Sequence, residues 1–437
     1  MIFSIDKQTL EELNLTGKFR TGSVYALFNK VKTNSGERLL DQMFRHPLIE
    51  ASAINERSSI FQYFEKAGYA FPFDPQQLTQ MREYVDAAGA GSAALVLAQT
   101  FMKKILSGLT RDERYRKSIQ GLQATIGVLQ RCHHFIDTIQ PPFVYEAKVD
   151  QIRKILADKK IQRLREMDIY QSLPLKTLAY YEHLLKTELN AGMAAVLAFI
   201  DELDVYIAVS GVSKSKGFSY AQALASEKNM LQAENLRHPC IDKAIGNKLQ
   251  MDRQSNVLFL TGANMAGKST LMKSIGIGLY LAHMGFPVAA DQMQFSVRQG
   301  LYSSINVSDN IGLGYSHFYA EVVRVKQAAE AAASGKRLLL MFDELFKGTN
   351  VKDAFDGTLA ITRSFADYTD CLFIVSTHII EVGEALKDKR NIRFAFMPTI
   401  MEGAIPRYTY RLKEGITEDR QGMMIIRNEG ILEMMED

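Results

Sequence analysis

The sequence contains little cysteine and no long hydrophobic run. Only three cysteines occur in 437 residues, and Cys132, Cys240 and Cys371 are far apart. That spacing excludes a disulfide framework and a Cys-x-x-Cys zinc site, so we expect a reducing compartment. The longest apolar runs, such as residues 257–260 and 338–342, are far too short to cross a bilayer. The first residues have no signal-peptide pattern, and we therefore expect a cytoplasmic protein without a membrane partner.

The chain also lacks a strong charge of either sign. Its formal net charge is only +3. A mildly basic balance permits nucleic-acid binding without requiring it, because a local basic patch matters more than the sum. Hydrophobic residues make up 47% and charged residues 23%, which predicts a globular chain with a large core. The length predicts about two or three domains.

The two halves of the chain have different patterns. Residues 1–235 are mainly helical in pattern, whereas residues 236–437 alternate short apolar runs with glycine-rich turns and helical stretches. The second pattern is typical of an α/β domain with a largely parallel sheet. In the first half, residues 36–44 are predicted to form a helix that Pro47 closes. Residues 178–209 contain no proline and predict one helix of about 30 residues, about 45 Å long.

One stretch of the first half is rich in positive charge. Residues 148–165 carry seven Lys and Arg side chains. One interpretation is a solvated helix face, because charge runs usually have that role. The other interpretation is an arm that contacts the phosphates of a nucleic acid, and the sequence leaves both open.

Three runs in the second half are continuously apolar, which is typical of central strands covered on both faces. They comprise residues 256–261, 337–342 and 371–376. Each run ends in polar residues. Ligands of open α/β sheets bind at the carboxyl ends of the strands, so the three endings are expected to converge on one site.

The first of these strands leads directly into a glycine-rich loop. Residues 262–269 match the pattern G-x-x-x-x-G-K-[ST], and a helical stretch follows. In such a loop the backbone N–H groups face phosphate oxygens, Lys268 supplies a charge for the β- and γ-phosphates, and the Ser269 hydroxyl can ligate Mg²⁺. The strand before and the helix after favour this interpretation over an ordinary glycine turn. The residues expected to bind the nucleotide are Gly262, Ala263, Asn264, Met265, Ala266, Gly267, Lys268, Ser269 and Thr270.

Polar residues after the other two strands complete the predicted site. Asp343 and Glu344 follow the second strand, about 75 residues after the loop. We expect Asp343 to hold Mg²⁺, directly or through water, and Glu344 to orient and polarise the attacking water. His378 follows the third strand, where it is expected to contact the γ-phosphate or that water. Lys268, Glu344 and His378 are thus the predicted catalytic residues. Position alone places the expected adenine contact at a side chain near Leu249 or Met251.

These residues carry a family likeness. Residues 261–270 resemble the phosphate loop of the MutS mismatch-repair ATPases, whose usual form is T-G-P-N-M-x-G-K-S-T, and the Asn-Met pair is the distinctive part. Residues 236–239, Leu-Arg-His-Pro, resemble the R-H-P that opens that ATPase domain. Residues 308–321 resemble the family's signature loop, residues 342–350 its D-E-x-x-x-G-T stretch, and residues 377–378 its T-H pair.

The resemblance implies a fold, a cofactor and partners. It implies a helical MutS-like core and lever domain over residues 1–235, with a reduced clamp around 145–175. An α/β P-loop ATPase domain of the ABC type would cover residues 236–437. The implied cofactors are ATP and Mg²⁺, the latter bound by Ser269 and Asp343. The implied partners are DNA and a second copy of the chain, because Ser316 takes the position of the family serine that reaches the partner's nucleotide.

Departures from the family pattern limit what carries over. Ala263 replaces the usual Pro, His317 the usual Thr, and Lys347 a frequent Arg, and none of these changes removes the catalytic pair. No mismatch-reading domain or Phe-x-Glu wedge precedes the core region, so mismatch recognition is not expected. The alternative function is therefore an ATP-latched binder of branched DNA or of structured RNA such as the ribosome. A transporter ATPase subunit is a third interpretation, which the helical first half and the Asn-Met loop disfavour.

Overall fold

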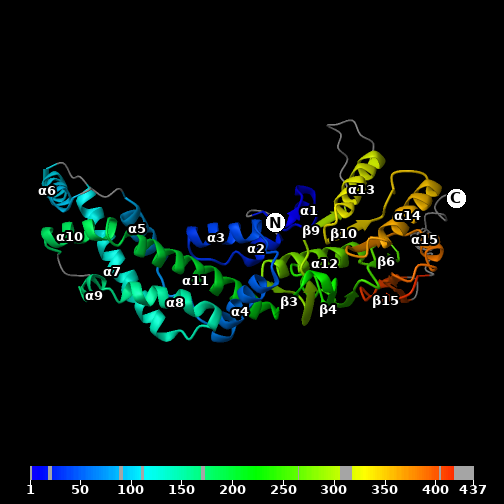
Figure 1. Ribbon diagram of the computed structural model, residues 1–437, viewed down its shortest axis with the longest axis horizontal. Helices are drawn as coiled ribbons and strands as arrows, with labels where there is room; N and C mark the ends of the chain where they lie inside the picture. The colour runs from blue at the N-terminus through cyan, green and yellow to red at the C-terminus, as the bar shows by residue number, and fades with distance from the viewer. Residues whose placement is uncertain are drawn as a thin grey trace, which may run out of the picture. The chain divides into compact units, whose positions relative to one another are not determined.

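The computed structural model describes most of the chain. The described residues are 2–17, 22–87, 92–109, 113–168, 173–263, 265–305, 317–402 and 405–417. They form two compact units, whose elements Figure 1 labels. We call them the α/β unit, which comprises residues 1–30, 41–58 and 212–437, and the helical unit, which comprises residues 31–40 and 59–211.

The two units do not divide the chain at the predicted boundary between residues 235 and 236. Strand β1 (Ser4–Ile5) pairs in parallel with β9 (Gly300–Ser304) at one edge of the main sheet. The buried Arg324 pairs with Asp6, which lies 318 positions earlier in the sequence. The N-terminal segment therefore belongs to the α/β unit. Local sequence patterns do not reveal this, because the paired segments lie far apart in the sequence.

Among the described residues, the main sheet of the α/β unit has seven strands in the order β1-β9-β10-β11-β6-β12-β15. All neighbouring pairs are parallel except β12 and β15. Three of its central strands confirm the three predicted apolar runs. They are β6 (Val257–Thr261), β10 (Leu338–Asp343) and β11 (Leu372–Ser376). On the side of β6 the sheet continues with β12 (Ile392–Phe396) and then β15 (Lys413–Glu414).

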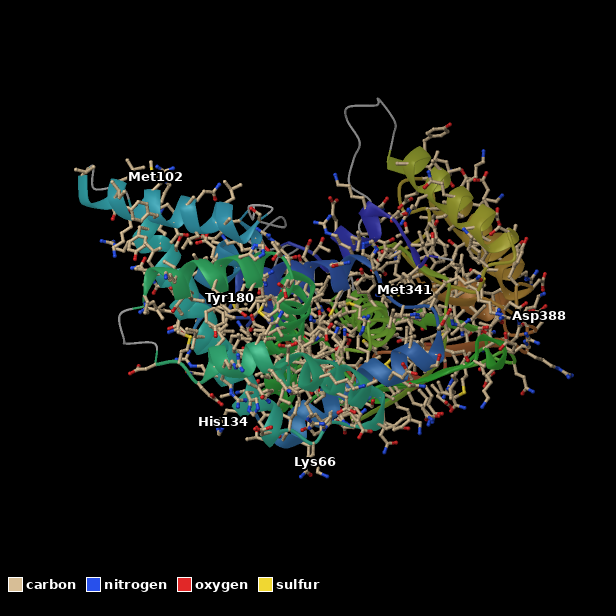
Figure 2. The ribbon with its side chains drawn as sticks, turned by 60° about the vertical axis from the view of Figure 1, so that its left-hand side comes forward. Lys66, Met102, His134, Tyr180, Met341 and Asp388 are labelled. Carbon is tan, nitrogen blue, oxygen red and sulfur yellow. The ribbon has the colours of Figure 1, made fainter. Side chains whose placement is uncertain are left out.

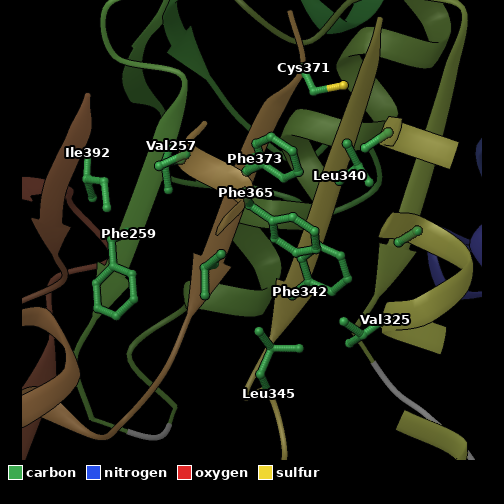
Figure 3. Close-up of a cluster of buried hydrophobic side chains, with 14 of the residues drawn as sticks. Val257, Phe259, Val325, Leu340, Phe342, Leu345, Phe365, Cys371, Phe373 and Ile392 are labelled. Atoms are coloured by element: carbon green, nitrogen blue, oxygen red, sulfur yellow. The ribbon is translucent and has the colours of Figure 1, made fainter. Parts of the chain in front are cut away.

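Helices cover both faces of this sheet, which explains why its strands are continuously apolar. On one face, the stacked rings of Phe342, Phe365 and Phe373 join the strands to α14 (Val351–Ala366), as Figure 3 shows. Helices α13 (His317–Ala333) and α15 (Ile380–Ala385) contribute to the same buried cluster. Helix α12 (Lys268–His283) contacts β10 and β11 and is buried along nearly its whole length.

Smaller elements complete the α/β unit. A second sheet has the order β3-β8-β4-β5, and two further strand pairs are β2-β7 and β13-β14. Their bounds are β2 (Ser219–Tyr220), β3 (Gln222–Leu224), β4 (Leu231–Leu236), β5 (Asn247–Met251), β7 (Pro287–Val288), β8 (Gln292–Ser296), β13 (Thr399–Glu402) and β14 (Ile405–Tyr408). The short helices are α1 (Lys7–Glu12), α2 (Val24–Phe28) and η1 (Ser226–Lys228).

The helical unit is built almost wholly from helices. They are α5 (Pro75–Asp86), α6 (Ala93–Leu109), α7 (Arg114–Thr138), α8 (Phe143–Leu156), α9 (Lys159–Arg165) and α10 (Leu175–Lys186), with most of α4 (Ala51–Ala67) and α11 (Asn190–Lys216). Helix α3 (Asn34–Arg45) confirms the predicted helix before Pro47. Met102 on α6 and Tyr180 on α10 both lie at the surface (Figure 2), and about half of each side chain is exposed.

The prediction of one helix over residues 178–209 is wrong. Helix α10 ends at Lys186 and α11 begins at Asn190. The Thr187 backbone leaves helical geometry, and its hydroxyl donates to the His183 carbonyl oxygen at 2.5 Å. This break spans nearly one helical turn. The apolar residues therefore keep their helical spacing across it, and the sequence pattern does not show the break.

The basic stretch 148–165 also consists of two helices rather than one. Helices α8 and α9 meet at Asp158, whose side chain accepts from the Lys160 backbone N–H. Several of its cations pair within the chain: Lys148 with Glu202 at 3.0 Å, Arg153 with Asp150, and Lys160 with Glu188. These pairs favour the solvated-face interpretation for those residues. Within the described part of the chain, no helix is long and apolar enough to span a membrane.

Candidate functional site

The predicted phosphate loop connects β6 to α12. Its two ends require unusual backbone angles, because Gly262 has a φ of +138° and Gly267 a φ of +103°. Only glycine adopts such values without strain. Met265 also has a positive φ, +69°, and its side chain is 81% exposed. Turns of this kind are typical of loops whose backbone N–H groups bind anions.

Lys268 lies inside this turn. Its ammonium donates to the carbonyl oxygens of Gly262 at 2.8 Å and Ala263 at 3.0 Å. The residue is only 5% exposed, and burial lowers the pKa of its ammonium, while the carboxylates of Asp343 and Glu344 oppose that shift. An ammonium group whose hydrogen-bond acceptors are neutral carbonyl oxygens would be stabilised by an incoming anion. The position and charge of Lys268 therefore suit a phosphate group in the loop.

The first turn of α12 meets the end of β10. The Ser269 hydroxyl donates to the Asp343 carboxylate, although the two residues are 74 positions apart. Strands β10 and β6 are both paired with β11, which places their carboxyl ends at the same edge of the sheet. Two hard oxygen ligands are thus held in contact, and such ligands fit a Mg²⁺ ion that also coordinates phosphate oxygens and water.

Glu344 is held in a strained conformation beside Asp343. Its φ is +54°, and its backbone N–H donates to the Ser376 carbonyl oxygen at 2.8 Å. Residues other than glycine rarely adopt this angle, and such strain is often found at functional sites. The hydrogen bond to β11 therefore fixes the direction of the Glu344 side chain.

His378 faces Glu344 across the gap between the ends of β10 and β11. Its Nδ1 lies 3.7 Å from Glu344 Oε1, which is an ion-pair distance. The His378 ring lowers the pKa of the Glu344 carboxyl, and Glu344 in turn raises the pKa of His378. Glu344 therefore stays ionised at neutral pH, as a group that polarises water must. The structure thus brings together Lys268, Ser269, Asp343, Glu344 and His378, as the strand pattern predicted.

A cavity of about 420 Å³ adjoins the loop and was not predicted from the sequence. Its lining includes Gly267 and Thr270 at the start of α12, Ile245 and Asn247 near β5, and Tyr410. This size fits a nucleobase with part of its sugar.

The side-chain amide of Asn247 joins the start of β5 to the segment around Tyr410 by two hydrogen bonds. Asn247 donates to the Tyr410 carbonyl oxygen at 3.0 Å and accepts from the Leu412 N–H at 2.7 Å. The adenine contact expected near Leu249 or Met251 stays a prediction; these two side chains are themselves at least 97% buried and do not line the cavity. On β5 they point into the core, and the preceding Asn247 reaches the cavity instead. A polar residue at the start of that strand was the available signal.

Two predicted site residues cannot be placed. Asn264 in the loop and Ser316 in the signature stretch lie outside the described residues. The remaining predicted loop residues lie on the turn or on the first turn of α12.

Two family models match this chain. The model described as MutS domain III matches residues 8–210, and the model described as MutS domain V matches residues 258–435. The loop and the ends of β10 and β11 therefore lie within the second match, whereas part of the cavity lining, including Asn247, precedes it.

Individual curated proteins resemble the chain more distantly. The DNA mismatch repair protein MutS of Pseudothermotoga lettingae is 24% identical over 364 residues, which cover 80% of this chain and 42% of that protein. The protein of the same name from Streptococcus pyogenes serotype M1 is 24% identical over 272 residues, or 61% of this chain and 30% of that protein. The chain thus spans less than half the length of these relatives.

Proposed function

The chain belongs to the MutS family, and from this premise we propose that it is an ATPase whose nucleotide site controls a grip on nucleic acid. The observation that carries the proposal is the contact between Ser269 and Asp343. It joins the phosphate loop to the strand end that bears Glu344. A glycine loop alone would support phosphate binding only, whereas this contact adds a metal position and a base to it.

We assign the parts of the site to the parts of ATP. The loop and Lys268 bind the β- and γ-phosphates, and the cavity beside Tyr410 receives the adenine and ribose. Residues Ser269 and Asp343 would hold Mg²⁺. When bound, this ion neutralises part of the charge on the phosphates. This arrangement is that of a P-loop ATPase domain of the ABC type, which is what the match to MutS domain V supports.

Hydrolysis is assigned to Glu344 and His378. The ionised Glu344 carboxylate accepts a hydrogen bond from the attacking water and orients it toward the γ-phosphate. The His378 ring lies near enough to Glu344 to hold that carboxylate in position. Protonated His378, which the raised pKa favours, also adds a positive charge beside the γ-phosphate that the water attacks.

The site is proposed to be completed by a second copy of the chain. The support is the likeness of residues 308–321 to the MutS signature loop, in which Ser316 takes the place of the residue that contacts the partner's nucleotide. ATP binding would then close a homodimer, and the helical unit would transmit the closure to bound DNA. Turnover of such a switch is expected to be slow.

The substitution Glu344→Gln tests the assignment of the base. It keeps the size of the side chain but removes the charge that polarises water, so ATP should still bind while hydrolysis falls by about 100-fold or more. Binding is measured by equilibrium titration with ATP, and hydrolysis by phosphate release.

The matched control is Glu384→Gln on α15, an exposed glutamate that pairs with Lys387 outside the site. Its turnover should equal that of the unaltered protein. Unchanged hydrolysis in Glu344→Gln would refute the role of Glu344.

A second candidate function concerns the nucleic acid. The curated relatives are more than twice as long as the matched region, so what they bind does not transfer directly. The alternative is an ATP-latched binder of branched DNA or structured RNA. The deciding measurement is ATPase rate and affinity with mismatched duplex, perfect duplex, a four-way junction and structured RNA at one stated salt concentration, because phosphate contacts make affinity salt-dependent. A large preference for the mismatched duplex would contradict this alternative.

A further inference from the structure

Helix α6 of the helical unit carries an apolar surface that the proposed ATPase activity does not use. Its large apolar side chains are 38–77% exposed along the whole helix, namely Leu95, Leu97, Phe101, Met102, Ile105 and Leu109. Figure 2 shows Met102 at this surface. Single exposed apolar residues are ordinary on a protein surface, whereas a contiguous apolar patch marks an interaction site.

The opposite side of α6 is packed against the rest of the helical unit. Val96 and Thr100 are buried, with exposed fractions of 4% and 0%, and Lys103 donates to Glu182 on α10 at 3.0 Å. Residues 96, 100 and 103 are four and three positions apart, so they share one helix face. The exposed apolar side chains therefore lie on the face that is directed away from α10.

The exposed face has the residue spacing of a coiled coil. Starting at Leu95, alternate steps of three and four positions reach residues that are all exposed, namely Ala98, Met102, Ile105 and Leu109. We call these five residues the α6 stripe. In this a/d pattern each side chain enters a hole between side chains of a facing helix. The spacing therefore specifies an α-helix as the occupant of the face.

The positions beside the α6 stripe carry no charge. Phe101 and Gly108 flank it on one side, and Gln99 and Leu106 flank it on the other, while Lys104 lies farther around the helix. In coiled coils, charges at the flanking positions select the partner helix and exclude others. Two copies of α6 can therefore meet without repulsion between like charges. The lack of flanking cations also disfavours a nucleic-acid backbone as the occupant.

The side chains of the α6 stripe complement one another in an antiparallel pair. When two copies of α6 run in opposite directions about an axis between residues 103 and 104, Ala98 of one copy lies opposite Leu109 of the other, and Met102 lies opposite Ile105. Because such a contact is isologous, each of these pairs occurs twice. A small side chain thus faces a large one at each end of the contact, which is how facing helices interdigitate.

We propose that α6 is a self-association surface, on which α6 of a second copy of the chain docks as a short antiparallel coiled coil. The helix has 17 residues and is therefore about 25 Å long. A contact of this length buries less than the roughly 800 Å² per partner that is typical of stable interfaces, so the pair is reversible. The contact differs in place from the homodimer proposed for the nucleotide site, and it requires no ATP.

Sedimentation equilibrium of the full chain without nucleotide tests the proposal, over micromolar to millimolar concentrations. The double variant Met102→Glu and Ile105→Glu places like charges opposite each other in the pair, so the dissociation constant should rise by about tenfold or more. The matched control is Phe143→Glu and Val144→Glu on α8, whose apolar side chains are 87% and 43% exposed. Its dissociation constant should stay within about twofold of the unaltered value, because surface substitutions outside the contact have little effect.

A cysteine pair tests the antiparallel register. In the variant Met102→Cys and Ile105→Cys, oxidised glutathione should link residue 102 of one copy to residue 105 of the other, which gives a covalent dimer on a non-reducing gel. The same substitutions at Phe143 and Val144 should leave the chain monomeric on that gel. The melting temperatures of all variants should stay near that of the unaltered protein, because the changed side chains are exposed.

The proposal is overturned if the unaltered chain remains monomeric up to millimolar concentration, which would leave a foreign helix or a lipid surface as the occupant of α6. It is equally overturned if the Met102 and Ile105 glutamate variant associates like its control, or if the cysteine pair gives no covalent dimer. None of these results bears on the proposed ATPase, whose test is the turnover of Glu344→Gln.

Discussion

The phosphate loop and the α6 stripe both occupy short segments of the chain, but they are built differently. In the loop, Lys268 rests on backbone carbonyl oxygens, and the two glycines with positive φ set the curvature. On α6 the backbone is an ordinary helix, and the exposed side chains alone form the surface. A backbone site needs a short contiguous motif, whereas a side-chain surface needs only a regular spacing of apolar residues.

This difference has a consequence for substitutions. Most donors of the loop are backbone N–H groups that no side-chain change removes, so its function depends on very few side chains. The α6 stripe distributes its contacts over several side chains, and each contributes a modest part. Substitutions should therefore act abruptly in the first region and gradually in the second.

Lys268→Ala should produce the largest effect. Removal of the only loop cation should lower ATP turnover by about 100-fold or more, because preorganised charge at the reacting phosphate is lost. Steady-state phosphate release measures this. Lys273→Ala, on the same helix but outside the loop, should retain nearly normal turnover. A loss of similar size in Lys273→Ala would indicate a general effect on α12.

Gly121→Ala should produce an intermediate effect in the helical unit. A Cβ at Gly121 would lie 2.6 Å from the Tyr84 side chain, so the ring must move and the free energy of unfolding should fall by about 1–3 kcal/mol. Gly108→Ala is the control, because a Cβ there meets nothing within 4 Å and the helix should gain about 0.5–1 kcal/mol. Denaturant unfolding measures both changes. Equal stability of the two variants would contradict the packing of Tyr84 on α7.

The contact of His378 with Glu344 should produce the smallest effect, and it depends on pH. The pKa of His378 is raised in the folded protein, so its stabilising contribution is fully present below its unfolded pKa and is lost as pH rises through the folded value. The side chain is half exposed, so the contribution is at most about 1 kcal/mol. The melting temperature of His378→Gln should differ from that of the unaltered protein at pH 6 and converge with it near pH 9. A difference that grows with pH would show that the sign is wrong.

The convergence of Lys268, Ser269, Asp343, Glu344 and His378 was predictable because these residues follow local rules. Continuous apolar runs identified β6, β10 and β11, and the polar residues after them marked the sheet edge where Ser269 meets Asp343. The cavity that adjoins the phosphate loop was not predictable in the same way. Tyr410 reaches it from 163 positions beyond Asn247, and no local pattern joins the two.

In the helical unit, the sequence pattern predicted helices but not where they end. Apolar periodicity identified helices but did not reveal the break between α10 and α11, because three residues preserve the direction of the apolar face. The sequence left open whether the basic stretch 148–165 is a solvated helix face or a phosphate-contacting arm, because ion pairs with distant carboxylates, such as that of Lys148 with Glu202, are visible only in the structure.

The sequence by itself determined the α/β character of the second half, the phosphate loop and the resemblance to MutS proteins. These features depend on neighbouring residues, namely glycine at strained angles and apolar runs that must be covered on both faces. Only the tertiary structure decided that the N-terminal strand closes the α/β sheet, that Asn247 and Tyr410 frame a cavity, and that the α6 stripe is exposed. Those features depend on contacts between distant positions, whose free energies no local pattern encodes.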